Sequence, residues 1–194
     1  EFAAVYPFVP YQFKLLQNVF EQVRKHGSAG KHLSEGERSL ISAFKESAYA
    51  IKDKEEGILI PFYDFYETIS EFLNPVITRV VENARINEAL KDDPFNINVL
   101  IILFMLKYIN SIPANLENIA TLMVTSIDED KLALKEKIKK SLQLLPSEIL
   151  IQKNGDEYIF LTDDEQDINK EIKEMTVEEN AMKSKLREMI FDDI

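Results

Sequence analysis

Basic residues around a short glycine-containing stretch are the first candidates for chemistry. The stretch begins at Gly27; Lys25 precedes it, and Lys31, His32 and Arg38 come after its second glycine. Basic side chains of this kind bind phosphate groups. The stretch departs from the Walker A pattern, which needs glycine where this chain has Lys25, and Ser or Thr where it has His32. We therefore expect these four residues to contact the phosphate of a nucleotide that is held elsewhere in a longer protein.

A second group of candidates is a set of five lysines in one predicted helix, residues 128–145. The set comprises Lys131, Lys135, Lys137, Lys139 and Lys140. On the third helix of a winged helix, these side chains would face DNA phosphates. With three to five phosphate contacts, the logarithm of the affinity would fall with the logarithm of salt concentration at a slope of about −3 to −4.5. Contact with a protein partner and a merely solvated face are the alternatives.

The composition excludes several classes of site. The 194 residues include no cysteine and two histidines, His26 and His32, which excludes thiolate metal sites, cysteine nucleophiles and multi-histidine centres. We expect no metal or cofactor in this chain and find no nucleophile–base pair for a hydrolytic enzyme. No apolar run is long enough to span a membrane and no signal peptide opens the chain, so we expect a cytoplasmic protein with no membrane contact.

The charge is unevenly distributed along the chain. Residues 155–194 carry 13 acidic and five basic side chains, whereas residues 96–154 carry six acidic and seven basic ones. Acidic surfaces repel nucleic acid, so the middle segment is where weak DNA contact is most plausible.

Amphipathic helices are predicted throughout the first half. They run from Pro10 to Gly27, from a Ser34 cap to about position 54, from Pro61 to position 72, and from Pro75 to Leu90. Proline disfavours helix at the residue before it, so Asp93-Pro94 is the predicted domain boundary.

The second half predicts three helices at about 98–108, 116–125 and 128–145, then a hairpin at 149–161 with an Asn154-Gly155 turn. Caps at Thr162 and Thr176 predict two final helices, 163–174 and 177–191. In the third helix, the residues expected to point inward are Leu132, Leu134, Ile138, Leu142 and Leu145.

Three helices followed by a hairpin is the order of a winged helix. We therefore predict a mainly α protein: a helical lid-like domain at 1–94, a winged-helix domain with one β-hairpin at 95–162, and a C-terminal helical extension at 163–194.

Three strings resemble one protein family. They run from Tyr6 to Gln17, from Arg24 to Ser39, and from Tyr158 to Ile168. All three are similar to the large P-loop ATPase of bacterial BREX phage-defence systems, the BrxC or PglY family. The third string is shared more loosely by related AAA-type ATPases that carry winged-helix appendages.

This resemblance implies a helical lid and a winged helix within a much longer ATPase that acts in restriction of phage DNA. Its Walker motifs, with ATP and Mg²⁺, would precede this region, and the opening Glu1-Phe2 fits a fragment. The implied partners are other domains or subunits of that ATPase and other defence-system proteins. The alternative function is a free-standing winged-helix DNA-binding regulator.

Overall fold

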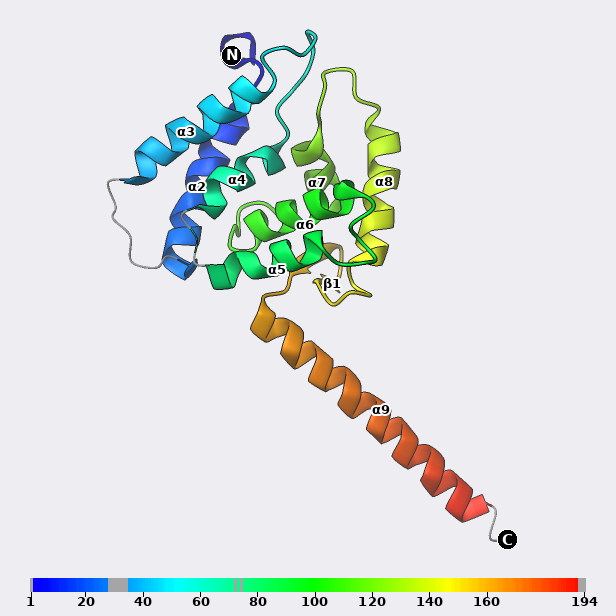
Figure 1. Ribbon diagram of the computed structural model, residues 1–194. Helices are drawn as coiled ribbons and strands as arrows, with labels where there is room; N and C mark the ends of the chain where they lie inside the picture. The colour runs from blue at the N-terminus through cyan, green and yellow to red at the C-terminus, as the bar shows by residue number, and fades with distance from the viewer. Residues whose placement is uncertain (1, 28–34, 72, 74, 192–194) are drawn as a thin grey trace.

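The computed structural model describes residues 2–27, 35–71, 73 and 75–191, and gives only the backbone for residues 23–24, 26–27, 35–39, 174–182, 186 and 188–191. Within these ranges the chain is mainly helical, with one two-stranded antiparallel hairpin, which confirms the predicted fold class. Figure 1 shows a rounded body from which the last helix, α9, projects. The predicted loop after Gly27 and the predicted Ser34 cap lie outside the described residues.

The helical segments that precede position 94 pack together through aromatic rings. In chain order they are α1 (Phe2–Val5), α2 (Pro10–Gly27), α3 (Glu35–Ala50), the 3₁₀ turn η1 (Phe62–Phe65), α4 (Tyr66–Ser70) and α5 (Pro75–Arg85). The ring centroid of Phe44 lies 5.0 Å from that of Phe8 and 5.1 Å from that of Phe65. These contacts join α3 to η1 and to the segment before α2.

Helix α5 is shorter than its sequence pattern predicts. It ends at Arg85, whereas the apolar periodicity continues to Leu90. The side chain of Asn87 accepts a hydrogen bond from the backbone N–H of Ala89, and such local bonds favour turns over helix.

Helix α6 (Pro94–Leu106) lies at the centre of the core. The carboxylate of Asp93 accepts a hydrogen bond from the N–H of Phe95 at 3.1 Å, and Pro94 occupies the first turn. The predicted buried helix is therefore confirmed, but it begins at Pro94 instead of Asn98. Because its residues are buried on all sides, it contacts elements from both halves of the chain.

Aromatic contacts of α6 link residues on either side of position 94. The ring of Phe104 lies 5.7 Å from that of Tyr66 in α4 and 5.3 Å from that of Phe160 in the hairpin. The buried apolar residues from Leu15 to Phe160 form one cluster. The domain boundary at Pro94 stays a prediction.

The elements after α6 follow the order of a winged helix. They are α7 (Leu116–Met123), α8 (Lys131–Leu144), β1 (Ile151–Asn154) and β2 (Glu157–Phe160). Asn115, which caps α7, also bridges to Glu157, and the N–H of Tyr158 donates to the carbonyl of Ala114 at 3.0 Å. Ala114 and Asn115, which precede α7, therefore extend the pairing of the hairpin.

The hairpin turn lies one residue later than its sequence predicts. Asn154 pairs with Glu157, so Gly155 and Asp156 form the loop, and Gly155 has a φ of +60°. A positive φ at the first loop position is typical of a type II′ turn, which requires glycine there. The predicted Asn154-Gly155 turn is wrong by this one position.

Helix α9 (Asp163–Phe191) is continuous where the sequence analysis predicts two helices. The segment between the two predicted helices contains neither glycine nor proline, so no residue there ends the first helix. Thr176 therefore lies inside a continuous helix and does not cap a new one. In the part of the chain that the structure describes, none of the helices combines the length and the apolar character that crossing a membrane requires.

Candidate functional site

Helix α8 carries the five lysines, and its orientation is set by its cap and its buried face. The carboxylate of Asp130 accepts hydrogen bonds from the N–H groups of Leu132 and Ala133, at 2.9 and 3.1 Å. Leu134, Ile138 and Leu142 are buried against the core. This burial fixes which side chains of α8 point toward solvent.

Two of the lysines lie on the flank of α8 that faces α7. The Nζ of Lys135 is 2.5 Å from the carboxylate of Glu117, and the Lys135 side chain is 19% exposed. The Nζ of Lys131 donates to the hydroxyl of Thr121 at 3.1 Å. The hydrogen bond from Lys135 lowers the pKa of Glu117 below its usual value. The charge of Lys135 is thus already paired within the fold.

A third lysine lies on the opposite flank, beside the start of α6. The Nζ of Lys137 is 4.0 Å from the centroid of the Phe95 ring and 3.9 Å from the carboxylate of Asp93. A cation over an aromatic ring is attracted by the ring quadrupole, so this contact favours the observed position of Lys137 over an extended one.

The last two lysines point outward. The Nζ of Lys139 is 2.6 Å from the carboxylate of Glu136 on the same helix. Lys140 is exposed, and among the described residues it has neither an ion pair nor a hydrogen bond. The five lysines therefore do not form one row toward a common ligand.

Leu132 is exposed, which corrects the prediction that it points inward. Its exposed fraction is 74%, whereas Leu134, which is also predicted to point inward, is buried. Residues two positions apart lie about 200° apart around a helix, so the two leucines cannot share the buried face. Ile127, just before the cap of α8, is also exposed, at 55%.

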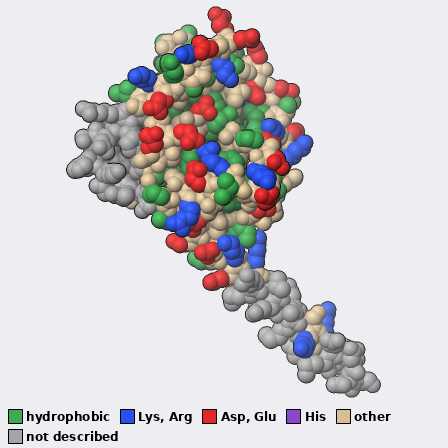
Figure 2. All heavy atoms as spheres, in the orientation of Figure 1, with side chains coloured by type: hydrophobic (Ala, Val, Ile, Leu, Met, Phe, Trp, Pro, Cys, Tyr) green, Lys and Arg blue, Asp and Glu red, His purple; other side chains and the backbone are tan. Residues whose placement is uncertain are grey.

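We call the solvent-facing side of this helix the outward face of α8. Its members share exposure and helical spacing, and they are Leu132, Glu136, Lys139, Lys140 and Gln143. Figure 2 shows acidic and basic side chains interspersed over the side of the body that is drawn. The outward face is thus apolar at its start and of mixed charge beyond it.

The predicted phosphate contacts are largely outside what the structure describes. Lys25 is exposed near the end of α2. Lys31 and His32 lie outside the described residues, and Arg38 lies in α3, where only the backbone is described. Their joint contact with a nucleotide stays a prediction.

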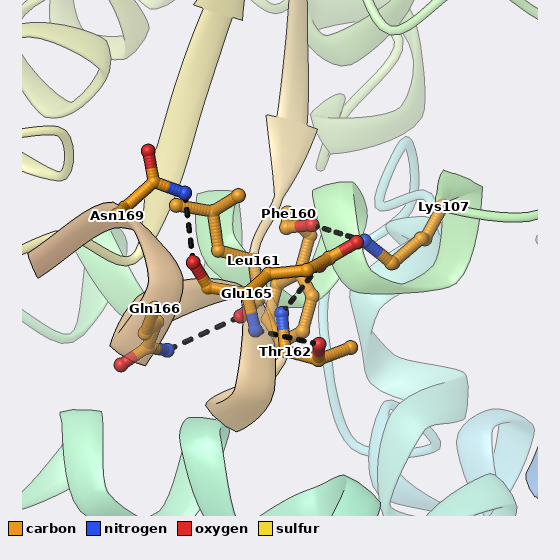
Figure 3. Close-up of polar contacts among 7 residues, drawn as sticks. All are labelled: Lys107, Phe160, Leu161, Thr162, Glu165, Gln166 and Asn169. Carbon is orange, nitrogen blue, oxygen red and sulfur yellow. Dashed lines mark hydrogen bonds and ion pairs between the residues drawn. The ribbon is translucent and has the colours of Figure 1, made fainter. Parts of the chain in front are cut away.

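A polar cluster that the sequence analysis missed joins the hairpin to α9 (Figure 3). The Nζ of Lys107 donates to the carbonyl of Phe160 at 2.7 Å and lies 2.5 Å from the carboxylate of Glu165. Glu165 also accepts from the N–H of Thr162 at 2.8 Å, and its own N–H donates to the Thr162 hydroxyl at 3.4 Å. The last two bonds form a capping box.

The Lys107 side chain is only 9% exposed, whereas the Glu165 side chain is 42% exposed, so water reaches the carboxylate but little of the lysine. Burial raises the pKa of Glu165, but hydrogen bonds from Lys107 and Thr162 outweigh burial, and the net pKa is lowered. The Thr-x-x-Glu spacing could have identified Glu165 from the sequence. Nothing in the sequence indicates Lys107, because its partner lies 58 positions away.

Two of the acidic residues at the start of α9 form ion pairs with basic side chains. Asp163 lies 3.5 Å from the guanidinium of Arg79 in α5, and Asp167 lies 3.0 Å from Lys170. Over the described residues, no three Asp, Glu or His side chains gather in a way that could hold a metal ion.

A cavity of about 430 Å³ lies between α2 and the α6–α7 connection. Its lining is largely apolar, and Tyr11 spans it with a hydrogen bond from its hydroxyl to the carbonyl of Thr121 at 3.1 Å. Burial raises the pKa of Tyr11 to about 12. The charged side chain among the described lining residues is Lys14.

Comparison with known proteins adds no family assignment. No family profile matches the chain, and no solved structure matches it.

Proposed function

We propose that this chain is a non-catalytic module of a larger P-loop ATPase of the bacterial BREX phage-defence type. We further propose that its winged-helix half contacts a protein partner through the outward face of α8. In this account, the module transmits the nucleotide state of the ATPase to that partner. The ATP and Mg²⁺ are bound by other parts of the parent protein.

The assignment to an ATPase is supported by the sequence strings from Tyr6 to Gln17 and from Arg24 to Ser39. The observation that carries the choice of a protein partner is the exposure of Leu132, at 74%, at the start of the third winged-helix helix. An apolar side chain at that position gains by burial against protein. It gains nothing from the charged backbone of DNA.

The ion pairs of α8 argue in the same direction. Contact between DNA phosphates and Lys135 would have to displace Glu117, which lies 2.5 Å away. Contact with Lys137 would have to remove its ammonium from the Phe95 ring, 4.0 Å away. Lys131, Lys139 and Lys140 then remain, and three phosphate contacts correspond to a log–log salt slope of only about −2.7.

Weak DNA contact by a free-standing regulator is the second candidate. The observation that favours it is the winged-helix order itself, with Gln152 and Lys153 exposed on β1 of the hairpin. An open reading frame with a Walker A motif upstream of this region would support the ATPase assignment. A frame of only this length would support the regulator.

The proposed partner contact is tested in the complete parent protein, together with the other proteins of its defence system. Leu132→Asp should abolish protection from phage while leaving parent protein levels unchanged. Ile86→Asp is the matched control, because Ile86 is 76% exposed on the body but lies outside α8. Full protection with Leu132→Asp would refute the proposed contact.

The non-catalytic assignment is tested on the isolated chain. We expect no ATP hydrolysis above the buffer rate. Hydrolysis that persists in a Lys31→Ala/Arg38→Ala variant would reveal a catalytic site elsewhere in this chain.

A further inference from the structure

Helix α9 carries a heptad pattern of apolar residues. The helix packs against α5 at its start and then projects away from the body (Figure 1). From position 168, apolar residues recur at alternating steps of four and three, the spacing of a coiled coil. The members of this heptad seam are Ile168, Ile172, Met175, Met182, Leu186 and Met189, with Glu179 at the remaining position.

The first residues of the seam are exposed to solvent. Ile168 is 56% exposed and Ile172 is 55% exposed, although isoleucine is among the residues most often buried. The 29 residues of α9 extend for about 43 Å at 1.5 Å per residue. A helix of this length and charge gains stability chiefly from packing its apolar stripe against another helix.

The charges of α9 differ between its two ends. Residues 163–179 carry eight acidic and two basic side chains, whereas residues 180–191 carry three basic and one acidic. A parallel pair of such helices would place acidic half against acidic half, and would place Glu179 against its own copy in the seam. An antiparallel pair places acidic half against basic half and Glu179 against a methionine.

From this complementarity we propose that α9 mediates antiparallel self-association, with the seam of one chain packed against the seam of a second copy. In antiparallel coiled coils, each a position faces a d position of the other helix. The register that uses both exposed isoleucines places Ile168 opposite Leu186 and Ile172 opposite Met182 of the second copy. It also brings Glu171 next to Lys185 of the second copy, twice along one flank of the pair. The two bodies then lie at opposite ends of the pair and do not compete for space.

Sedimentation equilibrium of the whole chain, from low-micromolar to near-millimolar concentration, tests the association. We expect a reversible monomer–dimer equilibrium. Leu186→Glu should abolish the dimer, because it places a charge within the seam. Val177→Glu is the matched control, since position 177 lies on the side of α9 away from the seam, and this variant should dimerise like the parent chain. A chain that stays monomeric at every concentration would overturn the proposal.

The orientation is tested by charge reversal and by a distance. Glu171→Lys and Lys185→Glu should each weaken the dimer, and the double variant should restore it, because the two charges exchange places across the pair. The chain has no cysteine, so Lys170→Cys accepts a single spin label. Antiparallel pairing places the two labelled positions about 20 Å apart along the axis. Labels at the same level along the axis, separated only by the width of two packed helices, would show parallel pairing and refute the proposed orientation.

Discussion

Replacement of Lys107 by methionine should destabilise the protein by about 2–3 kcal/mol. Lys107 provides the hydrogen bond to the carbonyl of Phe160 at 2.7 Å and pairs with Glu165. Leu161 donates its N–H to the carbonyl of Leu150, so the neighbouring residues Ile151 and Phe160 form a non-hydrogen-bonded pair. In such a pair the carbonyl of Phe160 points away from β1. Without Lys107, this carbonyl loses its partner.

The magnitude follows from the burial of the two acceptors. Phe160 is 1% exposed, and a buried carbonyl without a partner costs about 1–3 kcal/mol. The Glu165 side chain is 42% exposed and can be rehydrated, so the loss of its ion pair costs only about 0.5–1 kcal/mol. The methionine side chain offsets part of this cost because it fills the space of the lysine stem.

Urea unfolding followed by circular dichroism measures the effect. Lys153→Met is the matched control on the exposed side of the hairpin, and it should change the unfolding free energy by less than about 0.5 kcal/mol. Glu165→Gln should cost about 1 kcal/mol, because glutamine can still accept from the N–H of Thr162. If Lys107→Met is as stable as the control, the proposed role of the cluster in joining the hairpin to α9 is wrong.

Acidification provides an independent check on Glu165. Its pKa is lower in the folded protein than in the unfolded chain, so the ionised carboxylate stabilises the fold above the unfolded pKa. This contribution is lost as pH falls through the folded pKa. The stability difference between the parent chain and Glu165→Gln should therefore shrink below about pH 4.5. A difference that is constant down to about pH 3 would contradict this reasoning.

Five further substitutions test individual features of the fold by the same unfolding measurement. Tyr66→Phe should be neutral or slightly stabilising, because the buried Tyr66 hydroxyl has no hydrogen-bond partner among the described residues. Thr68→Val should cost about 1–2 kcal/mol, because it removes the 2.8 Å hydrogen bond to Glu46. Lys135→Ala should cost about 0.5–1 kcal/mol and Lys140→Ala less than about 0.5 kcal/mol, and equal effects would refute the assigned ion pair. Gly155→Ala should cost about 1–2 kcal/mol because its φ of +60° is unfavourable for alanine. The added Cβ would meet no atom within 4 Å, so no steric clash contributes. An unchanged stability would argue against this turn.

Local signals in the sequence were sufficient for most helix starts. Pro10 and Pro75 begin helices as predicted, and Asn115 caps α7, because proline and capping side chains act on the nearest turn. The start of α6 was missed because Asp93-Pro94 was interpreted as a boundary, although a cap followed by proline also begins a helix.

The candidate site was less predictable than the helices. The sequence identified α8 and its lysines, but whether a lysine faces solvent depends on which neighbouring element supplies a partner. Glu117 in α7 pairs with Lys135, and Phe95 in α6 contacts Lys137. These partners are distant in the sequence, so spacing alone could not reveal them, and Lys107 was missed for the same reason.

Titration of a fluorescent DNA duplex with the whole chain, at low and at physiological salt, tests the choice of a protein partner most directly. We predict no measurable binding at about 0.15 M salt, with any binding at low salt showing a slope of about −2.7 or shallower. The control is a Lys139→Glu/Lys140→Glu variant, which reverses both outward lysines of α8. Micromolar or tighter binding at physiological salt that this variant abolishes would contradict the account and establish the outward face of α8 as a DNA-contact surface.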